Sequence, residues 1–319
     1  MPARLPARFP RVVLIGRPGS PGLAEPLVRL AQFLTDRGHT VVLESETAAL
    51  AMQPPLPAVD AAQVGGAADL AIVLGGDGTM LSFARQLAPD DVPLIGINQG
   101  RLGFLTDIPL ARMEATLGAM LDGRYAEERR TLIDATVERA DGSREHALAL
   151  NDVVVNRGAL GTMIDLAIEI DGRFVYSMRA DGVIVTTPTG STAYALSAGG
   201  PIVAPQVPAF ALVPVAPHAL THRPIAIPDS ALIAIAISHG RDASVHCDGQ
   251  AHFGLSEGDR VALRRAAHRA RFLHPEDHDY FAMLRRKLHW SETPERIGRE
   301  RIRKPGVRGT ETEFTETDL

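Results

Sequence analysis

The sequence predicts an α/β N-terminal domain with a parallel sheet, followed by a mainly antiparallel β C-terminal domain. Up to about residue 125, short apolar runs alternate with segments whose apolar residues recur at helical spacing, which is typical of βαβ units. After residue 125 the strands alternate apolar and polar residues, and Asp-Gly pairs at 141–142, 171–172 and 248–249 favour tight hairpin turns. A length of 319 residues agrees with about two domains. We place them at residues 1–125 and 126–277.

The first domain contains two clear strand–helix–strand patterns. RVVLIG (11–16) and TVVLE (40–44) flank a segment in which Leu27, Leu30, Ala31 and Leu34 recur at helical spacing. A strand at 69–74, a helix from about residue 79 to 87 and a strand at 92–98 repeat the pattern. A further helix is expected over 109–121, with Pro109 in its first turn. Continuous apolar strands of this kind predict a parallel sheet that helices cover on both faces.

The second domain has one helical exception, TPTGSTAYALSAGG (187–200), in which turn residues precede a stretch compatible with helix from Ser191 to Ala198. The apolar segment 201–217 contains five prolines, so it is interpreted as loop and strand rather than as a membrane span. Residues 278–290 predict an amphipathic helix that packs back on the first domain. The charged residues 291–319 are expected to form a disordered tail.

Composition excludes several kinds of function. The formal net charge of −5 provides no bulk attraction for nucleic acid or for an anionic membrane, so neither is expected as a partner. Cys247 is the only cysteine, which excludes an intrachain disulfide and makes the cytoplasm the default location. Lysine occurs only at Lys287 and Lys304, so neither a P-loop nor the strand lysine of a protein kinase is present. A G-x-G-x-x-G fingerprint is also missing.

The segment DLAIVLGGDGTML (69–81) ends a buried strand with three glycines around Asp77. Glycines let backbone N–H groups approach phosphate oxygens, and the following helix N-terminus favours negative charge. A carboxylate inside such a phosphate cradle is useful if it binds a divalent cation, accepts a proton, or does both. The alternative is a tight turn in which Asp77 only caps the helix.

Other polar groups also have both a functional and a structural interpretation. Because lysine is scarce, positive charge near phosphates would come from backbone amides, Mg²⁺ and the candidates Arg17, Arg101 and Arg179, although each arginine could equally be a solvated surface charge. The turn in TPTGSTAY could bind a pyrophosphate or an amide, or could simply cap a helix. The run His246, Cys247 and Asp248 is better explained by a hairpin turn than by a metal site. The histidines lack ligand spacing and are expected to be structural.

The motif GGDGT, together with NDVVV (151–155) and DGVIVTTPTGSTAYALSAGGP (181–201), resembles the bacterial NAD kinase family over roughly residues 11–290. The resemblance implies an NAD kinase or diacylglycerol kinase-like fold. It also implies transfer of the γ-phosphoryl group of ATP to the 2′-hydroxyl of the adenosine ribose of NAD, which makes NADP. Mg²⁺ or another divalent cation would assist, and the enzyme would be a homodimer or homotetramer. Inorganic polyphosphate remains open as a second donor.

The resemblance also assigns residues. Asp77 matches the family aspartate that activates the acceptor hydroxyl and lies near the metal. Asn151 and Asp152 match an Asn-acid pair that binds the ribose and adenine region, where many members have glutamate as the acid, and Arg179 matches a position linked to preference for NAD over NADH. The ATP phosphates would be held by Gly75, Gly76, Gly78 and Thr79. The NAD pocket would comprise Asp77, Gly78, Phe104, Asn151, Asp152, Arg179, Asp181, Thr189, Thr192, Ala193, Tyr194 and Ser197.

Two other functions compete with NAD kinase activity. A lipid kinase would share the GGDGT cradle but would need an apolar acceptor pocket, whereas the second block offers small polar residues and a tyrosine. A catalytically silent NAD-binding module would not need Asp77 together with Asn151 and Asp152. Assays with NAD, NADH and diacylglycerol as acceptors distinguish the three possibilities.

Overall fold

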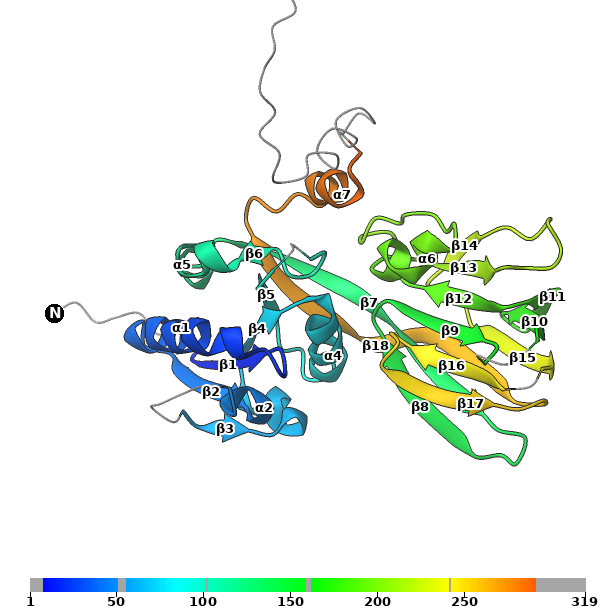
Figure 1. The fold of residues 1–319 in the computed structure, drawn as a ribbon, viewed down its shortest axis with the longest axis horizontal. Helices are drawn as coiled ribbons and strands as arrows, with labels where there is room; N and C mark the ends of the chain where they lie inside the picture. Colours follow the sequence, from blue (N-terminus) through cyan, green and yellow to red (C-terminus); the bar gives the residue numbers. More distant parts are fainter. Residues whose placement is uncertain (1–7, 51–55, 101–102, 159–161, 241, 291–319) are drawn as a thin grey trace, which may run out of the picture. The chain divides into compact units, whose positions relative to one another are not determined.

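The computed structural model describes residues 8–50, 56–100, 103–158, 162–240 and 242–290. The chain divides into two units, residues 1–276 and 277–319, which are described separately below (Figure 1). The predicted tail at 291–319 and the candidate Arg101 lie outside the described residues. None of the described helices is both long and apolar enough to cross a bilayer.

The N-terminal part of the first unit is a parallel sheet in the order β5-β4-β1-β2-β3, with β6 beside β5. The strands are β1 (Arg11–Gly16), β2 (Thr40–Glu44), β3 (Ala58–Val59), β4 (Leu70–Gly75), β5 (Leu94–Asn98) and β6 (Ile108–Pro109). The helices are α1 (Ala24–Asp36), α2 (Ser45–Ala48), α3 (Val64–Ala67), α4 (Asp77–Leu87) and α5 (Met113–Leu121), with 3-10 turns η1 (Pro21–Leu23), η2 (Ala61–Gln63) and η3 (Leu110–Arg112). The parallel α/β class predicted from the sequence is confirmed.

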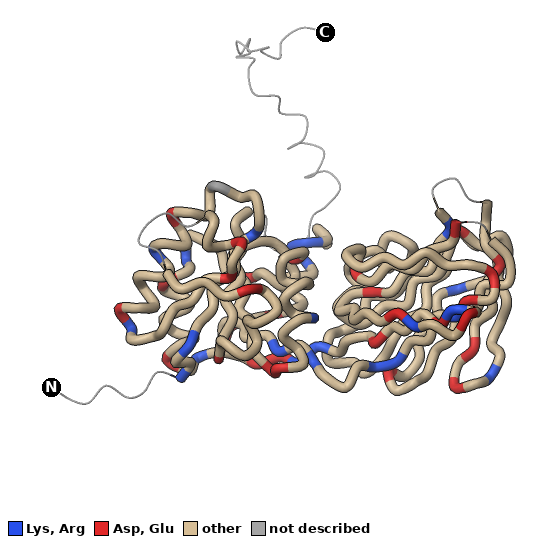
Figure 2. Tube along the Cα trace, turned by 90° about the horizontal axis from the view of Figure 1, so that it is seen from below, with Lys and Arg blue, Asp and Glu red and all other residues tan. Residues whose placement is uncertain are grey.

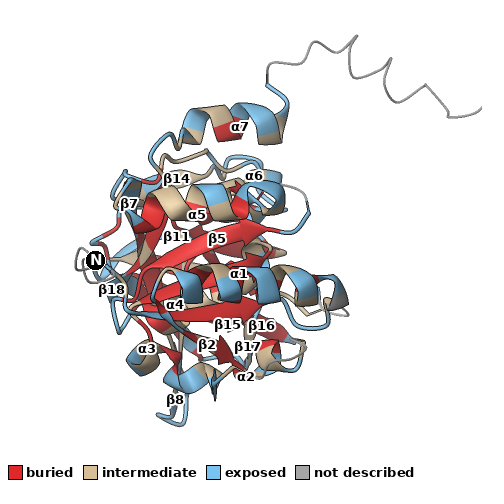
Figure 3. Cartoon of the chain, turned by 90° about the vertical axis from the view of Figure 1, so that its left-hand side faces the viewer, coloured by how far each residue is buried: buried red, intermediate tan, exposed pale blue. Residues whose placement is uncertain are grey.

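Helices cover this sheet on both faces because successive strand residues point in opposite directions. Leu14 packs in a cluster with α1 and α5, whereas its neighbour Ile15 packs in a second cluster with α4. The buried side of α1 consists of Leu27, Leu30, Ala31 and Leu34, the residues that recur at helical spacing in the sequence. Figure 3 shows the strands buried and the outer sides of the helices exposed.

The helix expected over 109–121 begins later than predicted. Pro109 lies in the short strand β6, η3 follows it, and α5 starts at Met113. The prediction that Pro109 occupies the first helical turn is therefore wrong. Pro109 has ψ of 140°, an extended conformation, so the chain pairs with β5 before it turns into the helix.

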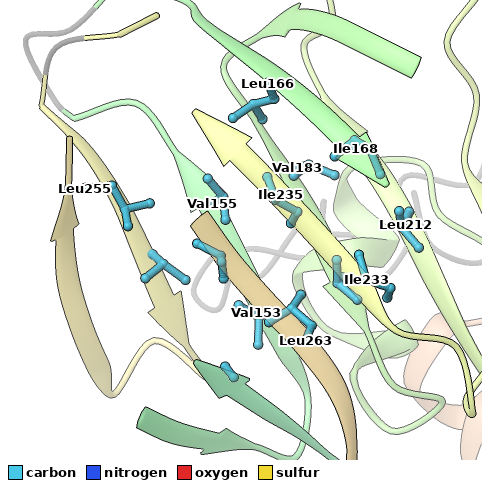
Figure 4. Close-up of a cluster of buried hydrophobic side chains, with 14 of the residues drawn as sticks. Val153, Val155, Leu166, Ile168, Val183, Leu212, Ile233, Ile235, Leu255 and Leu263 are labelled. Carbon is cyan, nitrogen blue, oxygen red and sulfur yellow. The ribbon is translucent and has the colours of Figure 1, made fainter. Parts of the chain in front are cut away.

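The C-terminal part of the first unit is antiparallel, as predicted. Its strands are β7 (Tyr125–Glu138), β8 (Arg144–Ala149), β9 (Asp152–Asn156), β10 (Ile164–Ile170), β11 (Arg173–Ala180), β12 (Gly182–Thr186), β13 (Ala209–Val215), β14 (Ile225–Pro228), β15 (Ile233–His239), β16 (Ala243–Cys247), β17 (Ala251–Leu255) and β18 (Arg260–Pro275). One sheet has the order β14-β13-β12-β9-β16-β17, and it packs against β10, β15 and β18 of the other sheet. Figure 4 shows Val153, Val155 and Val183 of the first sheet facing Leu166 and Ile235 of the second.

The two parts share one continuous sheet. Strand β18 pairs with β7 from Arg260–Glu138 to Pro275–Tyr125, and near its end Phe272 pairs with Leu94 of the parallel strand β5. The result is a 12-stranded sheet that runs from β11 to β3. Strand β18 joins the two parts, because it pairs with β5 of the parallel part and with β7 and β15 of the antiparallel part.

The segment 187–200 forms less helix than the sequence suggested. It contains the 3-10 turn η4 (Gly190–Thr192) and the short helix α6 (Tyr194–Ser197). Ala195 of α6 packs on Ile184 and Val213, on the side of the sheet away from the sandwich core. Strands β9 and β12 are consequently covered on both faces, which explains their unbroken apolar runs.

The Asp-Gly pairs lie at antiparallel turns, as predicted. Asp171 and Gly172, and likewise Asp248 and Gly249, all have positive φ, the conformation that a two-residue type I′ turn requires. The pair at 141–142 lies in a longer connection, in which only Gly142 has positive φ.

The second unit contains helix α7 (Tyr280–Leu288). The side chain of Asp279 caps it by accepting hydrogen bonds from the N–H groups of Phe281 and Ala282, at 2.9 and 3.1 Å. His289 ends the helix in the left-handed conformation. The predicted helix at 278–290 is therefore present in slightly shorter form.

Candidate functional site

The glycine-aspartate turn lies at the C-terminal end of the central strand β4, where open α/β sheets bind ligands. Strand β4 ends at Gly75, Gly76 has an extended conformation, and Asp77 opens α4. Apart from the adjoining residues and the backbone of the same helix turn, no atom of the described residues comes within 4 Å of the position that a Cβ would take on Gly76 or Gly78. A side chain at either position would therefore meet no steric clash with the described protein, so crowding does not explain why these residues are glycines. The space beside their bare amides is available to a ligand.

The carboxylate of Asp77 is held by the loop that follows β5. Its Oδ2 accepts a hydrogen bond from the N–H of Phe104 at 2.8 Å, and its Oδ1 accepts from the N–H groups of Leu105 and Thr106 at 3.0 and 3.3 Å. The hydroxyl of Thr106 also donates to Oδ1, at 3.2 Å. Asp77 does not cap its own helix. The alternative that it serves only as an N-cap is therefore not supported.

This contact requires glycine at position 103. A Cβ on Gly103 would lie 2.0 Å from Oδ1 of Asp77 and 2.3 Å from the hydroxyl of Thr106. Both are far inside van der Waals contact, so a larger residue would push the loop away from the carboxylate. Asn98 at the end of β5 supports the same loop, because its side-chain N–H donates to the Thr106 hydroxyl at 3.0 Å.

A cleft of about 620 Å³ opens beside the turn. Its walls come from the ends of β1 and β2, from η2, from α4 and from the β16–β17 turn. Gly76, Gly78 and Thr79 of the predicted phosphate site line it, together with Arg17, whereas Gly75 is buried at the end of β4. The other lining residues are Gly16, Pro18, Glu44, Glu46, Ala61, Ser82, Phe83, Gln86 and Gln250.

The predicted pair Asn151 and Asp152 precedes and begins β9. Asp152 is buried, and this burial together with the nearby charge of Asp248 raises its pKa from 3.8 to about 7. The backbone oxygen of Asn151 accepts hydrogen bonds from the N–H of Thr187 at 2.9 Å and from the hydroxyl of Thr186 at 3.1 Å. Residues 150–152 are thereby joined to the start of the TPTG turn.

The TPTG turn packs directly on Asn151. A Cβ on Gly190 would lie 2.2 Å from the backbone oxygen of Asn151, so only glycine permits this approach. Thr189 is buried, and its hydroxyl accepts a hydrogen bond from the Arg130 guanidinium at 3.2 Å. Ser191 is also buried, with its hydroxyl bonded to backbone groups of Pro188 and Val203, which fits a structural role.

The remaining predicted NAD residues differ in exposure. Thr192 and Ala193 are half-buried in and after η4, whereas Tyr194 and Ser197 are exposed on α6. Phe104 is half-buried beside Asp77. Asp181, between β11 and β12, accepts a hydrogen bond from the guanidinium of Arg157 at 2.6 Å. Arg179 is exposed on the edge strand β11, where its guanidinium lies 3.5 Å from the carboxylate of Asp165.

A buried chain of charges, absent from the sequence predictions, connects the loop that holds Asp77 to the TPTG turn. His274 of β18 lies 2.9 Å from a carboxylate oxygen of Asp107 and 3.3 Å from one of Glu128. Arg130 donates to Glu128 at 2.7 Å and also to Thr189. Burial opposes the charge on His274, but the two carboxylates outweigh it and raise its pKa.

Sequence reasoning also missed Arg85, Asp248 and Gln250 as partners of the site. The guanidinium of Arg85 on α4 forms an ion pair with Asp248 and hydrogen bonds Gln250. The Asp-Gly pair signalled the turn but not the contacts of its side chain. Figure 2 shows acidic and basic residues scattered along the chain, so charge density offered no guide either. Neighbouring Cys247 is buried, which raises the pKa of its thiol to about 12 and leaves it unreactive.

Family models match most of the chain. Residues 12–125 match the ATP-NAD kinase N-terminal domain, and residues 150–275 match the ATP-NAD kinase C-terminal domain. The chain is 52% identical over 287 residues to an NAD kinase of Burkholderia thailandensis, covering 90% of this chain and 96% of that protein. It is also 52% identical over 286 residues to an NAD kinase of Nitrosospira multiformis, covering 90% and 97%.

Solved structures agree with these matches. A yeast NADH kinase complexed with NADH superposes with a TM-score of 0.82 at 27% identity, over 91% of this chain and 90% of that chain. An NAD kinase from Archaeoglobus fulgidus in complex with ATP superposes with a TM-score of 0.70 at 28% identity, over 88% and 98%.

Proposed function

The chain belongs to the NAD kinase family, and from this premise we propose that Asp77 is the catalytic residue of its reaction. That reaction transfers the γ-phosphoryl group of ATP to the 2′-hydroxyl of the adenosine ribose of NAD. Phosphoryl transfer requires charge stabilisation around the transferred group and a base beside the acceptor hydroxyl. Asp77 lies in the sequence between Gly76 and Gly78, which line the cleft, while its own carboxylate is bound by residues 104–106 and is not among the lining groups.

The carboxylate of Asp77, held by residues 104–106 between two glycines that line the cleft, carries this proposal. A carboxylate has about four lone-pair sites, and Asp77 accepts four hydrogen bonds from residues 104–106. The two longest involve the N–H and hydroxyl of Thr106, at 3.3 and 3.2 Å. Oδ1 accepts three of these hydrogen bonds and Oδ2 accepts one, so a substrate hydroxyl would donate its hydrogen to Oδ2 of Asp77. The bonds to Oδ1 would keep the carboxylate aimed at that hydroxyl.

The triphosphate of ATP would occupy the 620 Å³ cleft. Its oxygens would be bound by the amides of Gly76 and Gly78, the hydroxyl of Thr79 and the guanidinium of Arg17. A Cβ on Gly75 would lie 3.2 Å from the Thr79 hydroxyl. Glycine at position 75 therefore lets Thr79 approach the end of β4. Inorganic polyphosphate could use the same groups. ATP is the donor that we expect to be used.

NAD would bind where the TPTG turn meets Asn151. Asn151 and Asp152 would hold the adenosine part, and Thr189, Thr192, Ala193, Tyr194 and Ser197 would line the rest of the pocket with Phe104 and Gly78. Asp181 would meet the nicotinamide end. Arg179 is the weakest member of this set, because its guanidinium points to Asp165 on the edge strand.

A divalent cation, preferably Mg²⁺, fits the donor set. Mg²⁺ prefers hard oxygen ligands and is usually held by one or two carboxylates together with phosphates and waters. Asp77 offers such oxygens next to the cleft, and the described part of the cleft contains no lysine to balance a triphosphate. When bound, the cation would neutralise phosphate charge. Since the protein oxygens of Asp77 already accept four hydrogen bonds, ATP would supply most of its ligands.

We further propose a cytoplasmic homodimer or homotetramer. The edge strand β11 exposes Phe174 and Val175, and Leu232 is exposed immediately before β15 of the same sheet. Apolar side chains gathered at an open sheet edge favour pairing with another copy. Light scattering after size-exclusion chromatography would measure the mass, and a monomer at micromolar concentration would contradict this proposal.

The decisive experiment measures NADP formation by purified protein with ATP or polyphosphate, with and without Mg²⁺, and with NAD, NADH or diacylglycerol as acceptor. Asp77→Asn should lower kcat by about 10²–10⁴-fold, the usual contribution of a positioned base. Thr106→Val is the matched control, because it removes one hydrogen bond to Asp77 but leaves the carboxylate. Near-normal kcat in Asp77→Asn would refute the role as base, and transfer to diacylglycerol alone would support the lipid kinase alternative.

A further inference from the structure

The turn between β16 and β17 carries a carboxylate that is completely buried. Asp248 has φ of 53°, and its side chain has 0% exposure. Its Oδ1 accepts hydrogen bonds from the N–H groups of Asn151 at 2.7 Å and Asp152 at 3.1 Å, and its Oδ2 accepts from Leu150 at 2.9 Å. The N–H of Asp248 in turn donates to the backbone oxygen of Asp152 at 2.9 Å. The backbone of residues 150–152 is therefore fixed to one side chain.

The same carboxylate is bound from the other side by the helix that carries Asp77. Arg85 lies eight residues after Asp77 on α4, about 12 Å along the helix axis. Its guanidinium, 15% exposed, forms an ion pair with Asp248 and a hydrogen bond to Gln250. Gln250 then donates from its side chain to the backbone oxygen of Gly78 at 2.9 Å. Helix α4 is thus tied to the turn both in its first turn and near its end.

Stability alone is a poor explanation for this arrangement. A buried ion pair loses much of its Coulomb energy to desolvation, and well-packed apolar residues are often as stabilising. Here, however, the carboxylate of Asp248 contacts both Arg85 on α4, the helix that begins with Asp77, and residues 150–152, part of which is proposed to hold the acceptor NAD. A shift of about 1 Å between reacting groups can cost about 10²-fold in rate.

We propose that Asp248, with Arg85 and Gln250, is a positioning group that sets the distance between Asp77 and the acceptor ribose held by Asn151 and Asp152. This inference rests on the proposed roles of Asp77, Asn151 and Asp152. Asp248 contacts no reacting atom in this account. It acts through the backbone of residues 150–152 and through α4.

The test uses the full-length protein and the variant Asp248→Asn. Asparagine followed by glycine suits a type I′ turn, so the hairpin should form. The side-chain NH₂ group of the asparagine, however, would face N–H donors of residues 150–152 that now donate to the carboxylate. We expect kcat at saturating NAD and ATP, per folded enzyme, to fall about 10- to 100-fold. The kcat of Arg85→Gln should fall by a similar factor. The double variant should be little worse than either single one, because the two side chains act as one unit.

Asp229→Asn is the matched control. Asp229 is also a buried aspartate paired with an arginine, at 2.7 Å from Arg265, and it is not one of the residues proposed to form the site. It should lower the melting temperature but leave kcat unchanged. If Asp248→Asn also lowers only the melting temperature, or if the two single effects multiply in the double variant, the positioning role is overturned.

Failure of this inference and failure of the proposed function give different results. NADP formation by the wild-type protein, with loss of activity in Asp77→Asn, supports the proposed function whatever Asp248→Asn does. If Asp248→Asn does not fold, Arg85→Gln decides by the same kcat criterion, because it leaves the turn intact. Normal kcat in a folded Arg85→Gln variant overturns the positioning role.

Discussion

Replacing Glu128 by Gln tests the buried chain of charges that connects Asp107, His274 and Arg130. Burial alone would raise the pKa of Glu128, but hydrogen bonds and charges from His274 and Arg130 outweigh it and lower that pKa from 4.5 to about 2. The folded protein therefore holds the ionised form more tightly than the unfolded chain does. Glu128→Gln, which resembles the protonated acid in shape, should lose this advantage.

The expected magnitude follows from the size of the shift. A difference of about 2.5 pKa units corresponds to about 3 kcal/mol of folding free energy at neutral pH. Because the folded-state pKa of Glu128 is depressed, this stabilisation is complete above pH 4.5 and is lost as the pH falls toward 2. Linkage leaves about 2 kcal/mol at pH 3.5. His274 acts in the opposite direction, since its raised pKa stabilises the fold below pH 6.5 and the effect is lost as the pH rises through the folded-state value.

Urea unfolding of the wild-type protein and the variant, followed by circular dichroism at pH 7, 4.5 and 3.5, measures the difference in free energy of unfolding. The comparison with Glu128→Gln cancels the titration of distant carboxylates. We expect the wild-type advantage to shrink by about 1 kcal/mol or more between pH 7 and 3.5. A difference that does not change with pH would refute the reasoning.

Three further variants follow from the site. Asp152→Asn should stabilise the protein by up to about 4 kcal/mol above pH 7 and by little below pH 4, because the raised pKa of Asp152 makes its charged form unfavourable in the folded protein as the pH rises. Urea unfolding at pH 5 and pH 8 measures this difference, and the KM for NAD should rise in the same variant. Gly103→Ala should lower kcat and cost about 1–3 kcal/mol by separating the loop from Asp77, whereas normal kinetics would contradict the need for close approach. Gly190→Ala should raise KM for NAD by displacing Asn151, and unchanged NAD binding by calorimetry would count against that contact.

Much of the fold could be predicted from neighbouring residues. Strands β1 and β2 begin and end at the predicted residues, and α1 buries the four residues at helical spacing. The Asp-Gly turns follow from the tolerance of Asp and Gly for positive φ. Pro109 was misplaced because a proline suits both an extended residue and the start of a helix, and only the pairing of β6 with β5 decided between them.

The candidate site was harder to predict than the fold. The GGDGT and TPTG segments could be recognised from the sequence because glycines and hydroxyl-bearing residues cluster there. The residues that hold them, such as Arg130 and Asp248, carry no such local signal. The roles assigned to the site residues stay predictions until the variants are measured.

The sequence by itself determined the main strand–helix alternation of the first domain, the β character of the second, the two phosphate-type turns and the family, because periodicity and turn chemistry depend on residues only a few positions apart. Only the tertiary structure decided what surrounds each functional group. Asp77 is bound by a loop 27 residues away, and Arg85 reaches Asp248 across 163 residues. Such contacts depend on how β18 joins the two parts of the sheet. The course of the chain through this sheet is set by packing over the whole chain rather than by any short motif.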